Sequence, residues 1–445
     1  MSKTKEQDML AVSQSAVAMA KEAGAKDASA RAYRVRDVSL EWRDGKPEKI
    51  TESTTRGLAI ALYVDGRFSS ISTSDLRPEA LKTFIADGIA LTKNLAADPF
   101  RALPDPELYK GQAAANLQLE DPKYLSINAD TARKLTKEME EAARSVKGSE
   151  SILSVSTSFS TNLVEQWMVT SNGFTGQTRA TGFYPGAYIS VKDKDGRRPE
   201  DGAFAGARMF SELPSAAELG RLASSRALSR LGSKKGETAN MTLAVENRVA
   251  GRLVGYLNGA LSAASIQQKR SFFEGKLGQP VLSDKISITD DPLVPKGFGS
   301  RKYDVEGIAA KPRTIFENGV LKSYYVDTYY GRKLKMAPTS GSVSNLAWKL
   351  GEKNAQQLLA DMKEGVLVTG FIGGNSNSGT GDFSLGITGF RVRNGVIAEP
   401  VAEMNISGNH LEFWKKLAAI GNDPYAYSSL RTPTLVFDNV SVAGA

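Results

Sequence analysis

The chain has 445 residues, of which 57 are Lys or Arg and 49 are Asp or Glu, so its formal net charge is +8 at pH 7. It contains no cysteine and a single histidine, His410, which excludes disulfide bonds, thiolate metal ligands, a cysteine nucleophile and any site that needs two imidazoles from this chain. Hydrophobic residues make up 41% and charged residues 24%, as in ordinary globular proteins.

The basic residues are scattered rather than gathered in a stripe with aromatic residues between them, so we expect a solvated surface and no nucleic-acid partner. No run of about 18 apolar residues is present, and we therefore expect no membrane span. The opening stretch MSKTKEQDML lacks the apolar core of a secretion signal, which favours a cytoplasmic location. The length predicts about two or three domains, and we divide the chain at 1–112, 113–235 and 236–445.

The first segment predicts a helix, a meander of strands and a second helix. Apolar residues at helical spacing predict the first helix over 6–23, ended by Gly24. Alternating apolar residues around two Asp-Gly turns predict strands over 33–42, 50–64 and 68–74. Pro78 suits the first turn of a helix that we expect to end near Asn94. The proline-containing residues 98–112 predict a linker.

The middle segment predicts a helix over 130–146 and, after Gly148, more strands. The predicted strands cover 152–158, 164–170 and 187–191. Ser215 and Glu218 form a capping-box pattern that opens a helix reaching Leu231. Because strands and helices are segregated rather than alternating, this segment predicts an α+β unit with an antiparallel sheet that packs with the first segment.

The third segment begins with a strand over 241–245 and a helix over 247–264. Glycines recur on this helix at 251, 255 and 259, and each costs about 1 kcal/mol relative to alanine. Close packing against another backbone explains them best, and a vacated functional position is the alternative. The later predicted strands cover 285–289, 313–317, 320–327 and 434–442. The fold class is α+β, with an N-terminal region of meander plus helices followed by a strand-rich, mostly antiparallel C-terminal domain.

The stretch 368–409 predicts a hairpin that begins with a small-residue loop. Asn394-Gly395 lies between the apolar-alternating runs 383–392 and 396–406, and both residues suit the positive φ angles of a type I′ turn. The loop over 373–381 lacks the Gly-Lys-Ser/Thr ending of a phosphate-binding loop and precedes a strand. A plain surface turn and the lip of a groove for a peptide backbone are the two interpretations left open.

Other candidate chemistry is weaker. Three carboxylate pairs could hold a hard metal ion, although turns and helix caps explain such pairs more often. The pairs are Asp290 with Asp291, Asp304 with Glu306, and Glu399 with Glu403. Ser407 and His410 lie three residues apart, but a nucleophilic pair also needs an orienting acid, and no Gly-x-Ser-x-Gly motif is present.

The chain contains a series of short, ordered blocks rich in small, polar and acidic residues. The blocks include Thr55-Arg56-Gly57, Ser72-Thr73-Ser74-Asp75-Leu76, Ser171-Asn172-Gly173, Asp290-Asp291-Pro292, Tyr303-Asp304-Val305-Glu306-Gly307, Gly379-Thr380-Gly381-Asp382-Phe383-Ser384, Pro400-Val401-Ala402-Glu403, Ile406-Ser407-Gly408-Asn409 and Ile420-Gly421-Asn422-Asp423. In their order and spacing these blocks resemble the TldD/PmbA family of metallopeptidase-related proteins, also described as modulators of DNA gyrase. The resemblance covers nearly the whole chain and is weakest over 1–30 and 100–150.

TldD-type members of this family carry a zinc site built on an HExxxH helix, with further ligands downstream that include a cysteine. On the matching helix of this chain, Gly255 and Ala260 occupy the two histidine positions and Tyr256 the glutamate position. No cysteine follows Asn422-Asp423. The resemblance therefore implies the PmbA (TldE-type) branch, with no catalytic residue, metal ligand or cofactor of its own.

By this resemblance, the chain pairs with a TldD-type subunit that holds zinc, and the complex degrades or trims unstructured or modified peptides. Extended peptides would bind by strand addition to a sheet edge. Asn375, Asn377, Asp382 and Ser384 are the candidates for a peptide- or partner-facing surface. In isolation the chain could instead form a homodimer. The alternative functions are a stand-alone hydrolase with an unrecognised site and a non-enzymatic regulator linked to gyrase or an antitoxin.

Overall fold

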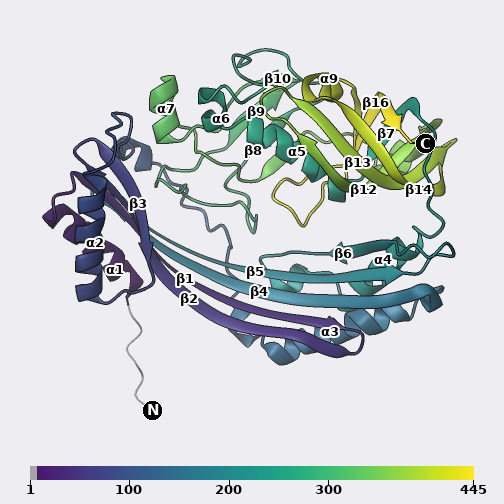
Figure 1. Ribbon diagram of the computed structural model, residues 1–445, viewed down its shortest axis with the longest axis horizontal. Helices are drawn as coiled ribbons and strands as arrows, with labels where there is room; N and C mark the ends of the chain where they lie inside the picture. The colour runs from purple at the N-terminus through teal and green to yellow at the C-terminus, as the bar shows by residue number, and fades with distance from the viewer. Residues whose placement is uncertain (1–7, 445) are drawn as a thin grey trace.

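The computed structural model describes residues 8–444 and has two parts that face each other (Figure 1). One part is a long, curved sheet built from residues 27–204, with helices on its outer face. The other part begins at residue 239 and contains the remaining sheets and helices. The predicted α+β class, with a strand-rich and mostly antiparallel C-terminal region, is confirmed.

The long sheet has the strand order β3-β2-β1-β4-β5-β6 and is antiparallel throughout. Its strands are β1 Asp27–Arg43, β2 Lys46–Val64, β3 Arg67–Thr73, β4 Ile152–Thr170, β5 Thr175–Val191 and β6 Glu200–Phe204. Since β1 pairs with β4 from Ser29↔Thr170 to Arg43↔Ser156, strands from the first and middle segments of the chain form one continuous sheet.

The middle strands are longer than the sequence predicted. The strands expected over 152–158 and 164–170 are parts of one 19-residue strand, β4, and the strand expected over 187–191 is the end of β5. Residues 159–163 keep the alternation of a strand, with Phe159, Thr161 and Leu163 buried and the residues between them half-buried. The polar residues between the two predicted strands therefore lie on one face of a continuous strand and do not end it.

Four helices cover the outer face of the long sheet. They are α1 Met9–Glu22, α2 Pro78–Thr92, α3 Ala129–Arg144 and α4 Ala216–Leu228. Alternate residues of β1 supply the contacts, with Ala30 and Ala32 packing in one core with α1 and α2, and Leu40 and Trp42 packing further along with α3. The capping box predicted at Ser215 is present. Of the helix expected over 6–23, residues 6–7 lie outside the described part of the chain.

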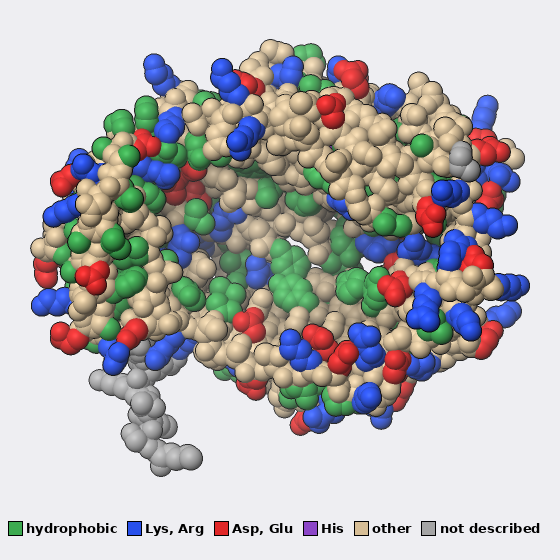
Figure 2. Space-filling view, viewed as in Figure 1, with side chains coloured by type: hydrophobic (Ala, Val, Ile, Leu, Met, Phe, Trp, Pro, Cys, Tyr) green, Lys and Arg blue, Asp and Glu red, His purple; other side chains and the backbone are tan. Residues whose placement is uncertain are grey.

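Within residues 8–444, the four helices of the long-sheet part all lie on its outer face, and its inner face is turned towards the C-terminal part (Figure 1). The two parts are in contact at several places. Arg31 donates a hydrogen bond to the backbone carbonyl of Val305, the Tyr425 hydroxyl donates one to the carbonyl of Phe204, and the Tyr184 ring on β5 stacks on Phe298 with centroids 6.0 Å apart. Figure 2 shows the surface hollowed between the two parts, with hydrophobic side chains among those on the floor of the hollow.

The C-terminal part is organised around a second sheet of order β14-β13-β12-β7-β16-β15, closed by an additional pairing of β14 with β16. Its pairings are antiparallel except that of β7 with β12. The strands are β7 Ala239–Val245, β12 Glu364–Ser376, β13 Asp382–Arg393, β14 Val396–Asn409, β15 Leu417–Ile420 and β16 Leu435–Ala443. Trp414 and Phe437 lie in the core that this sheet shares with the helix after β7.

A smaller sheet of order β10-β9-β8-β11 and five helices complete this part. The strands are β8 Ile288–Asp290, β9 Arg313–Glu317, β10 Val320–Leu321 and β11 Leu346–Trp348. The helices are α5 Asn247–Ala260, α6 Ala263–Gln267, α7 Thr328–Leu334, α8 Ala355–Ala360 and α9 His410–Lys415. Short 3-10 helices occur at η1 Pro106–Tyr109, η2 Tyr124–Ser126, η3 Ser149–Ser151 and η4 Phe210–Glu212.

Three predictions for this part were wrong in detail. The helix expected over 247–264 is interrupted after Ala260, because Ser262 caps the N-terminus of α6 by accepting a hydrogen bond from the backbone N–H of Ser265. The strand expected over 320–327 ends at Leu321. The loop expected from Gly373 is still strand, since β12 continues to Ser376.

The predicted linker 98–112 lies against the C-terminal part rather than free in solvent. The Arg332 guanidinium donates hydrogen bonds to the carbonyl oxygens of Phe100, Ala102 and Leu103. The Tyr329 hydroxyl donates to the Asp98 carboxylate at 2.7 Å. Among the helices of residues 8–444, none combines the length and apolar composition needed to cross a bilayer.

Candidate functional site

Helix α5 lies beside β12, beyond the point where β7 ends. Strand β7 pairs with β12 only as far as Val368, and the N–H of Glu246 then donates to the Val368 carbonyl at 3.0 Å. From there the chain enters α5, whose apolar residues Leu253 and Leu257 are buried in the C-terminal core. The start of α5 is tied to the long-sheet part by an ion pair between Glu246 and Arg226 of α4 at 2.7 Å.

The glycines of α5 do not pack closely against another backbone. In the part of the chain that the structure describes, a Cβ atom built at Gly255 or Gly259 would meet no atom within 4 Å apart from its chain neighbours and the helix's own backbone. One built at Gly251 would meet Leu430 and Thr432 at 3.6 and 3.7 Å. The prediction of close backbone packing was therefore wrong, because Gly255 and Gly259 are exposed. The alternative, a vacated functional position at Gly255, stays a prediction.

The three positions that match HExxxH have different surroundings. Gly255 is exposed, Tyr256 is half-buried, and Ala260 is fully buried. The Tyr256 hydroxyl accepts a hydrogen bond from Nε of Arg252 at 3.2 Å, and its ring lies 5.5 Å from the imidazole of His410. The only imidazole of the chain thus lies beside the position that the resemblance assigns to the catalytic glutamate.

His410 is the first residue of α9 and is completely buried. Its ring stacks against Phe272 and Phe383 at 5.4 and 4.8 Å, and this burial lowers its pKa to about 4. Nε2 lies 2.9 Å from the Ser376 hydroxyl, whereas Nδ1 has no hydrogen-bond partner among the described residues 8–444. We assign the proton to Nε2, because the other neutral tautomer would bury an N–H without an acceptor.

These residues do not fit a zinc ion. A protein zinc site uses about four nitrogen, sulfur or carboxylate ligands. Here glycine, tyrosine and alanine stand at the motif positions, and the one nearby imidazole is buried with its Nε2 bonded to Ser376. Within residues 8–444, no group of three or more His, Cys, Asp or Glu side chains could hold a metal ion.

The carboxylate pairs suggested as a hard-metal site have structural partners instead. Asp290 is buried, forms an ion pair with Arg313 at 2.7 Å and accepts a hydrogen bond from the N–H of Ser344. Glu306 accepts hydrogen bonds from the N–H and hydroxyl of Thr328 at the start of α7. Glu399 pairs with Arg393. These contacts involve one carboxylate of each pair, and a hard-metal role for the pairs stays a prediction.

The four candidate peptide- or partner-facing residues lie together at one end of the β12–β13 hairpin. Asn377 builds the turn, because its Oδ1 accepts hydrogen bonds from two following N–H groups at 2.9 and 3.3 Å. Asp382 accepts from the Asn409 amide at 3.0 Å, and Ser384 pairs with Asn405 on β14. Asn375 is exposed opposite Ser384. Two of the four therefore have turn-building roles, and a binding role stays a prediction.

The sequence analysis did not identify three residues of this region: Ser376, Arg248 and Arg252. His410 meets Ser376, which is 34 positions away, and not Ser407, which pairs in register with Ser384. Arg248 and Arg252 on α5 donate hydrogen bonds to carbonyl oxygens of β12. Their spacing of four residues on a helix that follows a strand could have indicated a shared target, since such residues lie on one helix face.

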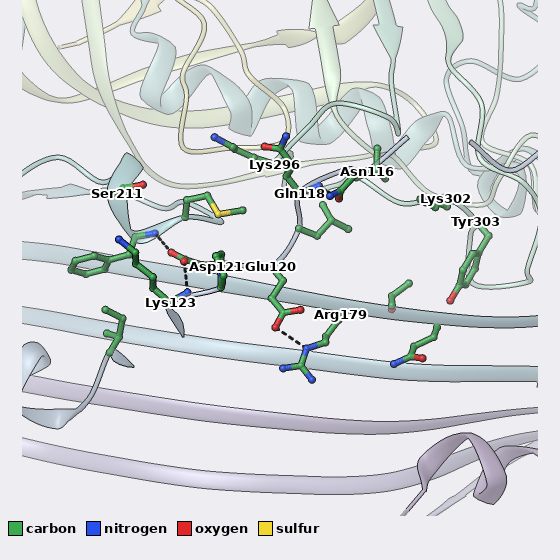
Figure 3. Close-up of a pocket in the computed structure, with 18 residues that line it drawn as sticks. Asn116, Gln118, Glu120, Asp121, Lys123, Arg179, Ser211, Lys296, Lys302 and Tyr303 are labelled. Atoms are coloured by element: carbon green, nitrogen blue, oxygen red, sulfur yellow. Dashed lines mark hydrogen bonds and ion pairs between the residues drawn. The ribbon is translucent and has the colours of Figure 1, made fainter. Parts of the chain in front are cut away.

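A second feature, distinct from α5, is a cavity of about 940 Å³ at the junction of the two parts (Figure 3). On its wall Arg179 pairs with Glu120 at 2.8 Å, and Asp121 accepts hydrogen bonds from the N–H groups of Lys123 and Phe210. The C-terminal part contributes residues such as Lys296, Lys302 and Tyr303. The cavity offers mixed polar surface with its charges largely paired.

Comparison with known proteins identifies relatives along the whole chain. The models described as PmbA/TldA metallopeptidase domain 1, central domain and C-terminal domain match residues 28–92, 122–231 and 238–444. The metalloprotease PmbA of Escherichia coli O157:H7 is 28% identical over 412 residues, covering 92% of this chain and 90% of the relative. A PmbA homologue of Haemophilus influenzae is 29% identical, covering 99% and 97%.

Solved structures show the same fold. A protein of Bacteroides thetaiotaomicron described as a modulator of DNA gyrase superposes with a TM-score of 0.94 at 37% identity, covering 98% of each chain. TldE of Thermococcus kodakarensis superposes with a TM-score of 0.85 at 18% identity, covering 97% of this chain and 100% of the other. The second likeness concerns the fold alone.

Proposed function

Because this chain belongs to the PmbA/TldD metallopeptidase family, we propose that it is the metal-free subunit of a TldD/TldE-type zinc peptidase complex. In this proposal a TldD-type partner holds the zinc and performs hydrolysis. The present chain completes the complex and helps to enclose unstructured or modified peptides that are degraded or trimmed. It binds no cofactor itself.

One observation carries the proposal: the helix that would hold zinc is retained while its ligands are absent. Leu253, Val254 and Leu257 anchor α5 in the core, so the helix keeps its place without any metal. The side chains at Gly255 and Tyr256 provide no nitrogen or carboxylate ligand at the matching positions. Without ligands no zinc ion is held there to activate a water molecule.

The hollow supports a role with peptide substrates. The inner face of the long sheet lies opposite the C-terminal part (Figure 1), and the surface is hollowed between the two parts (Figure 2). An extended chain is far narrower than a folded domain, so such a hollow selects unfolded peptides by size. We assign Asn375 and Ser384, at the end of the β12–β13 hairpin, to the peptide- or partner-facing surface together with Asn377 and Asp382.

The test is reconstitution with a TldD-type protein. We expect the two chains to co-purify, peptide cleavage to require both, and zinc to be found in proportion to the partner only. Changing the glutamate of the partner's HExxxH motif should abolish cleavage while the complex persists. Stoichiometric zinc in the isolated chain, together with chelator-sensitive cleavage, would overturn the proposal, as would failure to associate with any TldD-type protein.

A stand-alone hydrolase is the second candidate, and the Ser376–His410 pair is the observation that favours it. The pair is poorly suited to nucleophilic catalysis, because no carboxylate orients Nδ1 and burial lowers the imidazole pKa to about 4. Metal-independent peptide cleavage by the isolated chain that Ser376→Ala removes would establish this candidate. Recovery of gyrase or an antitoxin as the sole partner would instead indicate a regulator.

A further inference from the structure

Strand β12 loses its neighbour on one side after residue 368. Its pairing with β7 covers residues 365–368, whereas its pairing with β13 continues to Ser376. On the β7 side of 369–376, no other strand within residues 8–444 pairs with it. A strand edge of this kind presents backbone groups to which an extended peptide can add as a further strand.

Two arginines of α5 occupy this edge. The Arg248 guanidinium donates to the carbonyl oxygen of Thr369 at 2.8 Å, and that of Arg252 donates to the carbonyl oxygens of Gly373 at 2.6 Å and Phe371 at 3.4 Å. The three acceptors belong to alternate residues, as expected for carbonyls that point to one edge of a strand.

The spacing of the two elements makes this match possible. Four residues of an α-helix advance by about 6 Å, and two residues of a strand advance by about 6.6 Å. Because β12 is parallel to β7 and α5 follows β7, helix and strand run side by side, and the step from Arg248 to Arg252 matches the step from Thr369 to Phe371. The Gly373 carbonyl lies two residues farther along the strand, and Arg252 reaches it with the second terminal nitrogen of its guanidinium group.

Both side chains are held in place from the other side. Arg248 contacts the carboxylates of Glu246 at 3.3 Å and Asp201 at 3.5 Å, and its side chain is 18% exposed. Arg252 donates Nε–H to the Tyr256 hydroxyl and lies 5.7 Å from the centre of the Phe371 ring. The arginines thus bridge α5, β12 and, through Asp201, the edge strand β6 of the long sheet.

We propose that Arg248 and Arg252 close a latent peptide-binding edge on β12, so that this chain does not accept an extended peptide there. An added strand needs the carbonyls of Thr369, Phe371 and Gly373 as acceptors, and the guanidinium groups already use them. The substrate strand then belongs to the partner. The inference rests on the proposed function only for the kind of ligand, an extended peptide.

The test uses the isolated full-length chain and a fluorescently labelled, unstructured peptide, with binding followed by fluorescence anisotropy. We expect Arg252→Ala, and more strongly the double variant Arg248→Ala/Arg252→Ala, to bind the peptide at least about tenfold more tightly than the unmodified chain. Arg221→Ala, at an exposed position of α4, is the matched control and should leave binding unchanged. A peptide N-methylated at alternate residues should lose the gain, because it cannot donate to the strand edge.

Arg252→Lys disturbs the structure less than Arg252→Ala, because it keeps the positive charge. Since a lysine cannot bridge two carbonyl oxygens, we expect it to increase peptide binding by less than Arg252→Ala does. Near-ultraviolet circular dichroism confirms that each variant is folded. Two results would overturn the inference: folded variants that bind no better than the unmodified chain, or an unmodified chain whose binding falls when the arginines are removed. Neither zinc nor a partner is present, so failure here is distinct from failure of the proposed function.

Discussion

The best-defined electrostatic prediction concerns Glu306, which lies where the C-terminal part meets the long sheet. Burial, with smaller contributions from the nearby carboxylates of Asp304 and Asp327, raises its pKa from its ordinary value of 4.5 to about 7. The hydrogen bonds from Thr328, at 2.8 and 3.0 Å, favour the charged form but do not offset burial. Tyr63 and Tyr109 are the other titratable groups that it influences.

The sign of the effect follows from proton binding. Between pH 4.5 and about 7 the folded chain retains a proton on Glu306 that the unfolded chain has released. Stability from this group is therefore fully present below pH 4.5 and is lost as the pH rises through 7. At about 1.4 kcal/mol per pKa unit, the loss amounts to about 3 kcal/mol of unfolding free energy.

The substitution Glu306→Gln removes this loss, because a neutral amide oxygen can still accept both hydrogen bonds from Thr328. We expect the variant to equal the unmodified chain at pH 4 and to exceed it by about 2–3 kcal/mol at pH 8.5. Urea unfolding followed by tryptophan fluorescence measures the difference. Glu412→Gln, whose carboxylate is 70% exposed on α9, is the control. A difference between Glu306→Gln and the unmodified chain that is the same at both pH values would refute the reasoning.

Two further predictions concern α5 and its surroundings. Gly255→Ala should stabilise the chain by up to about 1 kcal/mol, because the added methyl group enters open space in a helix interior. Gly220→Ala should instead destabilise it by at least about 2 kcal/mol, because the new Cβ would lie 2.1 Å from the Met139 carbonyl oxygen. The midpoints of urea unfolding measure both effects. The buried imidazole of His410, with its pKa of about 4, stays neutral at pH values where the imidazole of the unfolded chain is already protonated. The unmodified chain should therefore lose up to about 3 kcal/mol of unfolding free energy as the pH falls from 6.5 towards 4, and His410→Phe should remove this loss. Equal acid sensitivity of both chains in urea titrations would contradict the second prediction.

Local turn chemistry made several elements predictable. Asp44-Gly45, Asp65-Gly66 and Asn394-Gly395 all have positive φ at both residues, as a type I′ turn requires, and each joins paired antiparallel strands. These signals depend on two adjacent residues and need no knowledge of the rest of the fold. The capping box at Ser215 was predictable for the same reason.

Elements that depend on distant partners were not predictable in this way. Strand β12 contains Gly370, Gly373 and Gly374, which locally indicate a loop, yet its pairing with β13 extends the strand to Ser376. The glycines of α5 indicate close packing by their spacing, but only the tertiary structure shows that Gly255 and Gly259 face open space. The partners of His410 and Arg252 lie 34 and 121 positions away.

The structure separates what keeps α5 in place from what α5 could do chemically. Its position depends on Leu253 and Leu257 in the core and on the Glu246–Arg226 ion pair, and none of these residues lies at a motif position. Of the positions that the resemblance matches to the zinc motif, Gly255 is exposed, and a Cβ added there would enter open space. We therefore expect the placement of α5 to be independent of whether positions 255, 256 and 260 hold metal ligands.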